Sequence, residues 1–450
     1  FLSHVEHMDC YTFGIPVREA QLMDPQQRVL LQNAFTVLCA SMHGAPKQTT
    51  AVAVGAWTSQ YADLCRVYAS APGPYTGAAS ALSVLCGRVS YTFGMQGPSV
   101  CIDTACSSSL VAAHVASAHL RDMECEDALV AGVSVNVGIG TFQVAAAASM
   151  LSLDGRCKTL DASADGYAKG ECCVVLRVSA GTTTDNATTG SRSSSALPLV
   201  VLEHSGVNQD GRSSSLTAPN GPSQQTLMTD VLLRAGVQGG VIDRLEMHGT
   251  GTSLGDPIEV GAALEVFASP SSAARHAARP GHALTLEGAK PRAGHCEPGA
   301  GVVGMLFAMS HITERTMAPL IHLRELNPHV EAATRRSTRV PHARVPTLPR
   351  QAAPRPWIVG SESGRGELAT TPLSRSGVSG FAFQGTNAHA IICRRHSPPE
   401  QHLSGYTNRT RTMLRSWEGQ RQWCAPEPHC FVTSVEATYL MSQQFGSKRM

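Results

Sequence analysis

The 450-residue chain is poor in charge. Only 16% of its residues are charged, and 36 basic residues nearly balance 34 acidic ones, for a formal net charge of +2. Such an even balance gives no electrostatic basis for binding nucleic acid or an anionic membrane surface. The chain is also 42% hydrophobic, so it can bury a large core and is not disordered throughout. The composition favours one large domain or two fused halves, and it leaves small or carrier-bound substrates open.

The fourteen cysteines lack the spacing of a zinc site, since no CxxC pair with a matching second pair occurs. We therefore expect no metal site and reduced thiols in an intracellular protein, with the cytoplasm as the default compartment. The chain begins at Phe1 without a basic and apolar leader, and we interpret it as a fragment, a processed product or an incomplete gene model. Organelle targeting stays open, because a targeting segment would precede Phe1.

Long uncharged runs are also scarce. The longest, residues 128–153, is interrupted by Ser134, Asn136 and Gln143, which favours a buried strand and loop over a membrane span.

Elsewhere, short β-rich runs alternate with helices of small residues, which is typical of a layered α/β protein. Asp24 and Pro25 suit the cap and first position of one such helix. We expect an N-terminal half over residues 1–178, a flexible Ser/Thr-rich linker over 179–196, a C-terminal half over 197–392 and a peripheral tail over 393–450.

One cysteine, Cys106, lies where a nucleophile is expected. Residues 99–103 are typical of a buried strand and residues 107–120 of a helix, so Cys106 falls at a strand-to-helix turn. The free N–H groups of a helix N-terminus favour thiolate over thiol. A lone cysteine is usually a buried hydrophobe, but the three serines that follow keep the turn uncrowded and have little packing value. We predict that Cys106 carries an acyl thioester.

Two histidines lie in glycine-flanked turns. His248 ends a short strand before a Gly-Thr-Gly-Thr turn, and we expect Asp256 to cap the helix that follows. His295 precedes an apolar helix, and Lys290 lies five residues before it. Catalytic groups gather at strand ends in α/β folds, and a buried lysine beside a histidine requires a polar partner. A third glycine-rich turn, within residues 380–389, predicts a hairpin whose backbone N–H can face the cysteine.

Together these motifs resemble the β-ketoacyl synthase family, most closely the ketosynthase of type I modular polyketide synthases. The principal motifs are Asp-Thr-Ala-Cys-Ser-Ser-Ser-Leu (103–110), Glu-Met-His-Gly-Thr-Gly-Thr (246–252) with Gly-Asp-Pro (255–257), Gly-His (294–295) and Gly-Thr-Asn-Ala-His (385–389). Further matches are Met-Asp-Pro-Gln-Gln-Arg (23–28), Gly-Arg-Cys-Lys-Thr (155–159), Asp-Gly-Tyr (165–167) and Val-Asn-Gln-Asp-Gly (207–211). These motifs occur along the chain in the same order as in the family, so a chance match is not a serious alternative explanation.

The resemblance implies a thiolase-like fold, an α/β five-layer αβαβα sandwich of two similar halves, usually as a homodimer. It implies that Cys106 accepts an acyl chain from an acyl carrier protein. His248 and His295 would hydrogen-bond the thioester carbonyl of a malonyl unit as it loses carbon dioxide. No cofactor is expected on this chain itself, because the phosphopantetheine arm of the carrier protein brings the substrates.

The same resemblance assigns roles to further residues. The backbone N–H groups of Cys106 and Phe383 would form an oxyanion hole. Lys290 would hold His295 in place, and Thr250 and Thr252 would contact the phosphopantetheine arm.

Several positions depart from the family's pattern. The twelve residues before Phe13 are too few for the strand and helix that normally begin the fold, so an N-terminal strand is expected to be missing. Cys172 and Ala382 stand where glycines are usual, and Pro291-Arg292 replaces Ser-Asn. We expect these departures to leave the chemistry intact and to lower the stability of the isolated chain.

We therefore predict a β-ketoacyl-[acyl-carrier-protein] synthase, an acyltransferase that performs decarboxylative Claisen condensation in polyketide or fatty acid biosynthesis. The alternative is a catalytically inactive ketosynthase-like scaffold or carrier-protein-binding domain. A non-decarboxylative thiolase is disfavoured, because the motifs carry the Cys-His-His pattern of decarboxylative enzymes. Chain length and starter unit depend on the shape of the pocket, which motifs do not set.

Overall fold

The computed structural model describes residues 2–40, 48–68, 73–180, 200–268, 284–314, 318–338, 346–349, 374–394 and 437–441. Its strands form two mixed sheets. The N-terminal half contains α1 (Val17–Leu22), α2 (Pro25–Ala40), β1 (Ala51–Gly55), α3 (Gln60–Tyr68), α4 (Thr76–Ser80), α5 (Leu82–Phe93), β2 (Ser99–Ile102), η1 (Ala105–Ser107), α6 (Ser108–Arg121), β3 (Asp127–Ser134), α7 (Gly140–Ala147) and β4 (Cys172–Ser179).

The C-terminal half contains β5 (Val200–Gln209), α8 (Gly221–Ala235), η2 (Gly239–Val241), β6 (Arg244–Glu246), α9 (Gly255–Ala263), η3 (Leu264–Ala268), β7 (Leu284–Glu287), α10 (Lys290–Ala293), η5 (Glu297–Gly299), α11 (Ala300–Glu314), α12 (Pro328–Thr338), β8 (Pro346–Thr347), β9 (Arg375–Phe381) and β10 (Thr386–Arg394). A last strand, β11 (Ala437–Met441), follows near the end of the chain.

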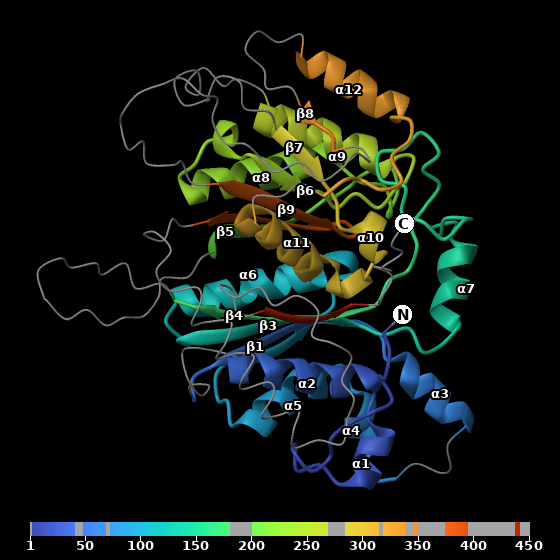
Figure 1. The fold of residues 1–450 in the computed structure, drawn as a ribbon, viewed down its shortest axis with the longest axis vertical. Helices are drawn as coiled ribbons and strands as arrows, with labels where there is room; N and C mark the ends of the chain where they lie inside the picture. Colours follow the sequence, from blue (N-terminus) through green and yellow to red (C-terminus); the bar gives the residue numbers. More distant parts are fainter. Residues whose placement is uncertain are drawn as a thin grey trace, which may run out of the picture.

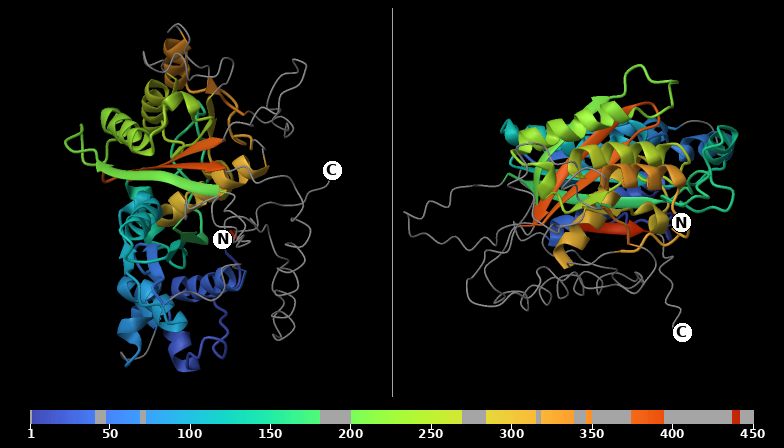
Figure 2. Two further views of the ribbon diagram at one scale, coloured as in Figure 1. Left: turned by 90° about the vertical axis from the view of Figure 1, so that its left-hand side faces the viewer. Right: turned by 90° about the horizontal axis from the view of Figure 1, so that it is seen from above.

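Helices and sheets alternate in five layers (Figure 1). Helices α2 and α5 cover the outer face of the N-terminal sheet, α6 and α11 lie between the sheets, and α8 and α9 cover the outer face of the C-terminal sheet. The left view of Figure 2 shows the same stacking, with the blue N-terminal half below the green and orange C-terminal half. The predicted five-layer sandwich of two similar halves is confirmed.

Small residues allow the central layer to pack closely. A Cβ atom at Gly55 of β1 would overlap the backbone of Ser109 in α6. One at Gly301 of α11 would lie 2.7 Å from the Cβ atom of Leu110. Glycine at both positions therefore lets the sheet and the two central helices approach to backbone contact, which brings the N-terminus of α6 beside that of α11.

The two sheets have equivalent strand arrangements, except that the C-terminal sheet carries one further edge strand, β8. The N-terminal sheet runs β11-β4-β3-β1-β2 and the C-terminal sheet β5-β10-β9-β6-β7-β8. At equivalent edges, β11 pairs antiparallel with β4, and β5 pairs antiparallel with β10. Residues 437–441 thus hold the place of the N-terminal strand that the sequence predicts to be missing. These residues belong to the tail predicted over 393–450, and their backbone completes the hydrogen bonding of β4 at the edge of the sheet. The predicted domain boundaries themselves stay a prediction.

Other local predictions have mixed outcomes. Helix α2 begins at Pro25, and the Asp24 carboxylate accepts a hydrogen bond from the Gln26 N–H at 2.8 Å, as predicted. The uncharged run 128–153 contains the fully buried β3 and the short α7. In the part of the chain that the structure describes, no helix is long and apolar enough to cross a membrane. The predicted linker lies outside the described residues, apart from its first two.

Candidate active site

Cys106 lies in the single turn η1, between β2 and α6. The Asp103 carboxylate accepts a hydrogen bond from the Ala105 N–H at 3.1 Å, and Ala105 adopts a positive φ of 53°. The left-handed backbone conformation of Ala105 turns the chain sharply, so the sulfur of Cys106 faces the interior at the start of α6. Cys106 is 8% exposed, as a site that excludes water requires.

The serine run after Cys106 packs tightly, contrary to the prediction that it has little packing value. Ser107, Ser108 and Ser109 are completely buried. The Ser108 hydroxyl donates to the Ala105 carbonyl at 2.6 Å and accepts from the Thr104 N–H at 2.9 Å. The Ser109 hydroxyl accepts from the Val302 N–H at 3.1 Å, which links α6 to α11. The Ser107 hydroxyl donates to the Thr104 carbonyl at 3.0 Å, so the three hydroxyls together hold the turn and join the two halves of the fold.

His295 comes from the C-terminal half and reaches the sulfur. Its backbone N–H donates to the Ala168 carbonyl at 2.7 Å, and its carbonyl accepts from the Gly170 N–H at 2.8 Å. The Glu297 N–H donates to His295 Nδ1 at 3.1 Å, so the ring proton of the neutral imidazole lies on Nε2. That Nε2 is 3.1 Å from Cys106 Sγ. Burial and the charge of Lys290 lower the pKa of His295 well below its usual range, so the ring is a neutral hydrogen-bond donor.

His248 lies beside His295, with the ring centroids 5.6 Å apart in an edge-to-face arrangement. Its N–H and that of Gly249 donate to the Glu259 carboxylate at 2.6 and 2.8 Å. Burial, followed by the charge of Lys290, lowers the pKa of His248 well below its usual range. The site therefore holds two neutral imidazoles side by side.

The turn after His248 is held differently from the prediction. Helix α9 begins at Gly255, and Asp256 does not cap it. Instead the Asp256 carboxylate accepts hydrogen bonds from the Gly251 N–H at 3.1 Å and the Leu160 N–H at 2.7 Å. Gly251 has a φ of +79°, and a Cβ atom there would lie 2.7 Å from the Lys158 nitrogen, so this position requires glycine. Asp256 thus ties the histidine turn to the N-terminal half.

The other predicted site residues lie around this centre. Lys290 begins α10, is 7% exposed and acts electrostatically on Cys106 and on both histidines. The hydroxyls of Thr250 and Thr252 are 3.4 Å apart in the turn after His248. The β9–β10 hairpin forms as predicted, and the Phe383 N–H lies within hydrogen-bonding reach of the Cys106 sulfur.

The charge state of the nucleophile differs from the prediction. Burial raises the pKa of the Cys106 thiol to about 12, and the carboxylate of Glu297 acts in the same direction. The charge of Lys290 and the N–H groups of Phe383 and Cys106 oppose this shift without cancelling it. Desolvation therefore outweighs the helix N-terminus, and the resting nucleophile is a thiol. Since a thiol reacts slowly with alkylating reagents at neutral pH, slow labelling of Cys106 would not distinguish the inactive scaffold from an active ketosynthase.

The departures from the family's pattern are accommodated locally. Ala382 packs with Ala105, Cys106 and Trp57 around the nucleophile. Arg292 donates to the Pro319 carbonyl at 3.1 Å. Cys172 is completely buried, and its sulfur occupies the space that a Cβ atom at position 299 would need. Glycine at position 299 has no Cβ atom and therefore leaves room for this sulfur.

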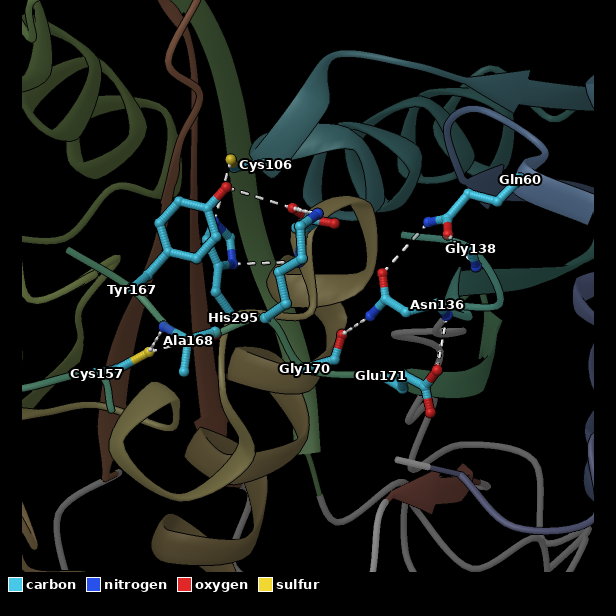
Figure 3. Close-up of polar contacts among 12 residues, drawn as sticks. Gln60, Cys106, Asn136, Gly138, Cys157, Tyr167, Ala168, Gly170, Glu171 and His295 are labelled. Atoms are coloured by element: carbon cyan, nitrogen blue, oxygen red, sulfur yellow. Dashed lines mark hydrogen bonds and ion pairs between the residues drawn. The ribbon is translucent and has the colours of Figure 1, made fainter. Parts of the chain in front are cut away.

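Three residues of the site had no role predicted from the sequence, although one of them, Tyr167, belongs to the Asp-Gly-Tyr match (165–167). Lys169 Nζ and Tyr167 Oη contact the same carboxylate oxygen of Glu297, at 2.5 and 3.3 Å. Figure 3 shows Tyr167 beside His295, with Cys106 above them, and the ring centroids of Tyr167 and His295 are 4.9 Å apart. The available signal was weak: a glutamate two residues after His295, at the start of an apolar helix, and a lysine two residues after Tyr167.

The described residues contain one cluster with the geometry of a metal site, His4, Glu6 and His7. All three are exposed. They come from the chain's first residues, whereas the centre built on Cys106 uses none of them.

The chain matches two family models, described as the N-terminal domain of β-ketoacyl synthase over residues 1–180 and its C-terminal domain over residues 199–324. It is 36% identical over 397 residues to a subunit of the phenolphthiocerol/phthiocerol polyketide synthase of Mycobacterium tuberculosis, a match that covers 87% of this chain and 23% of that protein. It is 36% identical over 404 residues to erythronolide synthase EryA2 of Saccharopolyspora erythraea, covering 89% of this chain and 10% of that protein. The chain thus spans less than a quarter of the length of these relatives.

Solved structures agree. The ketosynthase from module 6 of the bacillaene synthase of Bacillus subtilis 168 superposes with a TM-score of 0.73 at 26% identity, covering 98% of this chain and 74% of that one. An oxazolomycin ketosynthase domain of Streptomyces albus JA3453 gives a TM-score of 0.72 at 28% identity, covering 89% and 65%. The thiolase-like fold predicted from the sequence is confirmed. Since the family models cover both halves and the fold agrees, the chain belongs to the β-ketoacyl synthase family.

Proposed function

We propose that this chain catalyses decarboxylative Claisen condensation between an acyl chain on Cys106 and a malonyl-type thioester. The observation that carries the proposal is the approach of His295 Nε2 to within 3.1 Å of Cys106 Sγ, with the neutral His248 ring beside it. A nucleophile at a helix start and two neutral donors suit a reaction that develops negative charge on thioester oxygens.

In the first half-reaction, the Cys106 sulfur attacks the carbonyl carbon of an acyl thioester. The backbone N–H groups of Cys106 and Phe383, which face the sulfur, are the donors for the resulting oxyanion. Collapse of the intermediate breaks the carbon–sulfur bond to the carrier, and the proton of the Cys106 thiol passes to the leaving thiol. The raised pKa of Cys106 means that this proton is lost during attack and not beforehand.

In the second half-reaction, a malonyl thioester loses carbon dioxide, and the electron pair of the broken bond forms an enolate. His248 and His295 donate hydrogen bonds to the enolate oxygen, which neutral imidazoles can do without being deprotonated themselves. The enolate carbon attacks the acyl carbonyl on Cys106, and the carbon–sulfur bond breaks as the new carbon–carbon bond forms. The sulfur leaves as a thiolate and takes up a proton from water, which restores the resting thiol. The charge of Lys290 helps to keep both rings neutral.

The partners follow from this reaction. An acyl carrier protein would present both thioesters on its phosphopantetheine arm, with Thr250 and Thr252 as contacts for the arm, and no cofactor would stay on the chain. A homodimer is supported by β2, an edge strand of the N-terminal sheet in the described structure, whose residues are exposed or half-buried. The resemblance to polyketide synthases favours a polyketide over a fatty acid product, and intracellular localisation stays a prediction.

The test uses mass spectrometry of the chain after incubation with an acyl-carrier thioester, followed by addition of a malonyl-carrier thioester. We expect an acyl adduct on Cys106 that disappears as a β-ketoacyl product forms. Cys106→Ala should give no adduct. His248→Ala and His295→Ala should form the adduct and fail to elongate it. A folded wild-type chain without an adduct would favour the inactive scaffold.

A further inference from the structure

A buried ion pair joins the two halves of the fold directly beside the site. Lys169 precedes β4 in the N-terminal half, and Glu297 begins η5 in the C-terminal half. Lys169 Nζ lies 2.5 Å from Glu297 Oε1, and both side chains are 1% exposed. Two charges withdrawn so completely from water are costly to keep unless they are paired with good geometry. Their position next to the nucleophile therefore requires an explanation beyond stability.

The pair is connected to His295 by its backbone and by Tyr167. The Glu297 N–H holds His295 Nδ1, while the Glu297 carboxylate receives both Lys169 and the Tyr167 hydroxyl. Lys169 and His295 also form a backbone bridge between their segments. The imidazole of His295 is thus held in place by its own chain segment, through Glu297, and by residues 167–170 of the N-terminal half.

The surroundings of Lys169 leave Glu297 as the charge that balances it. Lys169 Nζ lies over the rings of Trp57 and Phe142, at 5.6 and 5.3 Å from their centroids, and aromatic faces attract a cation but do not neutralise it. Conversely, an uncompensated Glu297 carboxylate would place a full negative charge near the sulfur of Cys106. The Glu297 carboxylate raises the pKa of Cys106 even within the pair, and the ammonium group of Lys169 offsets part of that negative charge.

We propose that Lys169 and Glu297, with Tyr167, form a positioning network that holds His295 in place against Cys106 across the two halves and keeps the summed charge of the Lys169–Glu297 pair at zero. The inference rests on the proposed function for its purpose, but the network itself can be tested without condensation.

The readout is the pH profile of alkylation at Cys106 by iodoacetamide, resolved residue by residue by mass spectrometry on the whole chain. The titratable groups around Cys106 are His248, His295, Lys290, Tyr167, Lys169 and Glu297. The main variants change only Lys169 and Glu297. Glu297→Gln removes a negative charge and leaves Lys169 uncompensated, and both effects favour the thiolate.

We expect Glu297→Gln to shift the profile to lower pH by half a unit to one unit, which is roughly a three- to tenfold faster alkylation at pH 7.5. Lys169→Met should give no such acceleration. The double variant Lys169→Met/Glu297→Gln again has no net charge at the pair, so its profile should return to within about twofold of the wild type. Cancellation distinguishes the network from a merely structural role, because structural damage from two substitutions would accumulate.

Condensation gives the second readout. Glu297→Gln and Lys169→Met should each lower kcat roughly tenfold or more through a misplaced His295. Lys169→Arg, which keeps the positive charge, should retain most of the wild-type kcat. Asp127→Asn is the matched control, since it breaks another buried ion pair, Arg177 Nη2 to Asp127 Oδ2 at 2.7 Å, and should leave the alkylation profile unchanged.

An unshifted profile in Glu297→Gln, or a double variant that alkylates as fast as Glu297→Gln alone, would overturn the network. Circular dichroism identifies any variant that fails to fold, and Tyr167→Phe then offers a milder perturbation that should lower kcat without changing the charge. If the wild type does not condense but the profiles shift and cancel as stated, the proposed function fails and the network stands.

Discussion

Replacing Gly299, the residue directly before the central helix α11, by alanine tests how the fold accommodates the side chain of Cys172. An alanine Cβ atom would overlap the Cys172 sulfur, far inside the 3.0 Å below which real Cβ contacts do not occur. The next nearest atoms, from Gly132, lie at 3.4 and 3.6 Å, which is ordinary contact. Gly299 does not have a positive φ, so the backbone itself tolerates alanine. The sulfur is therefore the main obstacle.

The magnitude follows from overpacking of a completely buried position. Gly299→Ala should cost about 1–3 kcal/mol of unfolding free energy. Cys172→Ala alone should cost about 1 kcal/mol, because it removes one buried heavy atom. In the double variant the new methyl group occupies the space of the lost sulfur, and alanine restricts the unfolded chain by a further ~0.4–1 kcal/mol relative to glycine. We expect the double variant to be close to the wild type.

The assay is differential scanning calorimetry of the four proteins. At roughly 2.1 cal/mol/K per residue over 450 residues, the unfolding entropy is about 1 kcal/mol/K, so each kcal/mol lowers Tm by about 1 °C. Gly299→Ala should therefore lower Tm by about 1–3 °C, and adding Cys172→Ala should restore it. Gly87→Ala is the control, since a Cβ atom at Gly87 meets nothing within 4 Å. Additive losses in the double variant would refute the proposed contact.

Three further predictions concern charge and the last strand. Alkylation of Cys106 should accelerate with pH up to at least pH 10 without a plateau, because burial raises the pKa of its thiol to about 12; a plateau near pH 7 would contradict this. Burial likewise raises the pKa of Glu246 to about 8 from 4.5, so its contribution to stability is complete below pH 4.5 and is lost as the pH rises to 8. Tm measured from pH 5 to 8.5 should therefore fall more in the wild type than in Glu246→Gln, and parallel curves would exclude this shift. Removing residues 437–450 should leave one edge of β4 unpaired, and amide hydrogen exchange should become faster in β4 but not in β10; unchanged protection of β4 would show that β11 does not pair there.

Local features of the sequence were sufficient for the elements around the nucleophile. The strand before Cys106, the helix after it, the cap at Asp24 and the hairpin near residue 385 depend on neighbouring residues, and all form at the predicted places. The strand before Cys106 is not buried as predicted, because β2 is an edge strand whose residues are exposed or half-buried. The family's motifs also identified Cys106, His248 and His295 as one group, although they are far apart in the chain. The structure brings the three together.

Tertiary structure decided what depends on burial and on distant partners. The protonation of Cys106 is set by desolvation, which a local pattern does not report, and it reversed the predicted thiolate. Asp256 bonds to Leu160, which lies 96 residues earlier, instead of capping its own helix. The Lys169–Glu297 pair spans 128 residues, and the edge of β4 is filled by a strand from the far end of the chain. The sequence by itself thus determined the family, the candidate nucleophile and the order of the elements around it, because those depend on residues close together along the chain or on whole motifs. The charge of the site and the partners of its buried polar groups were decided only in the folded chain, where removal from water makes each unpaired charge costly and contacts between distant segments supply the compensation.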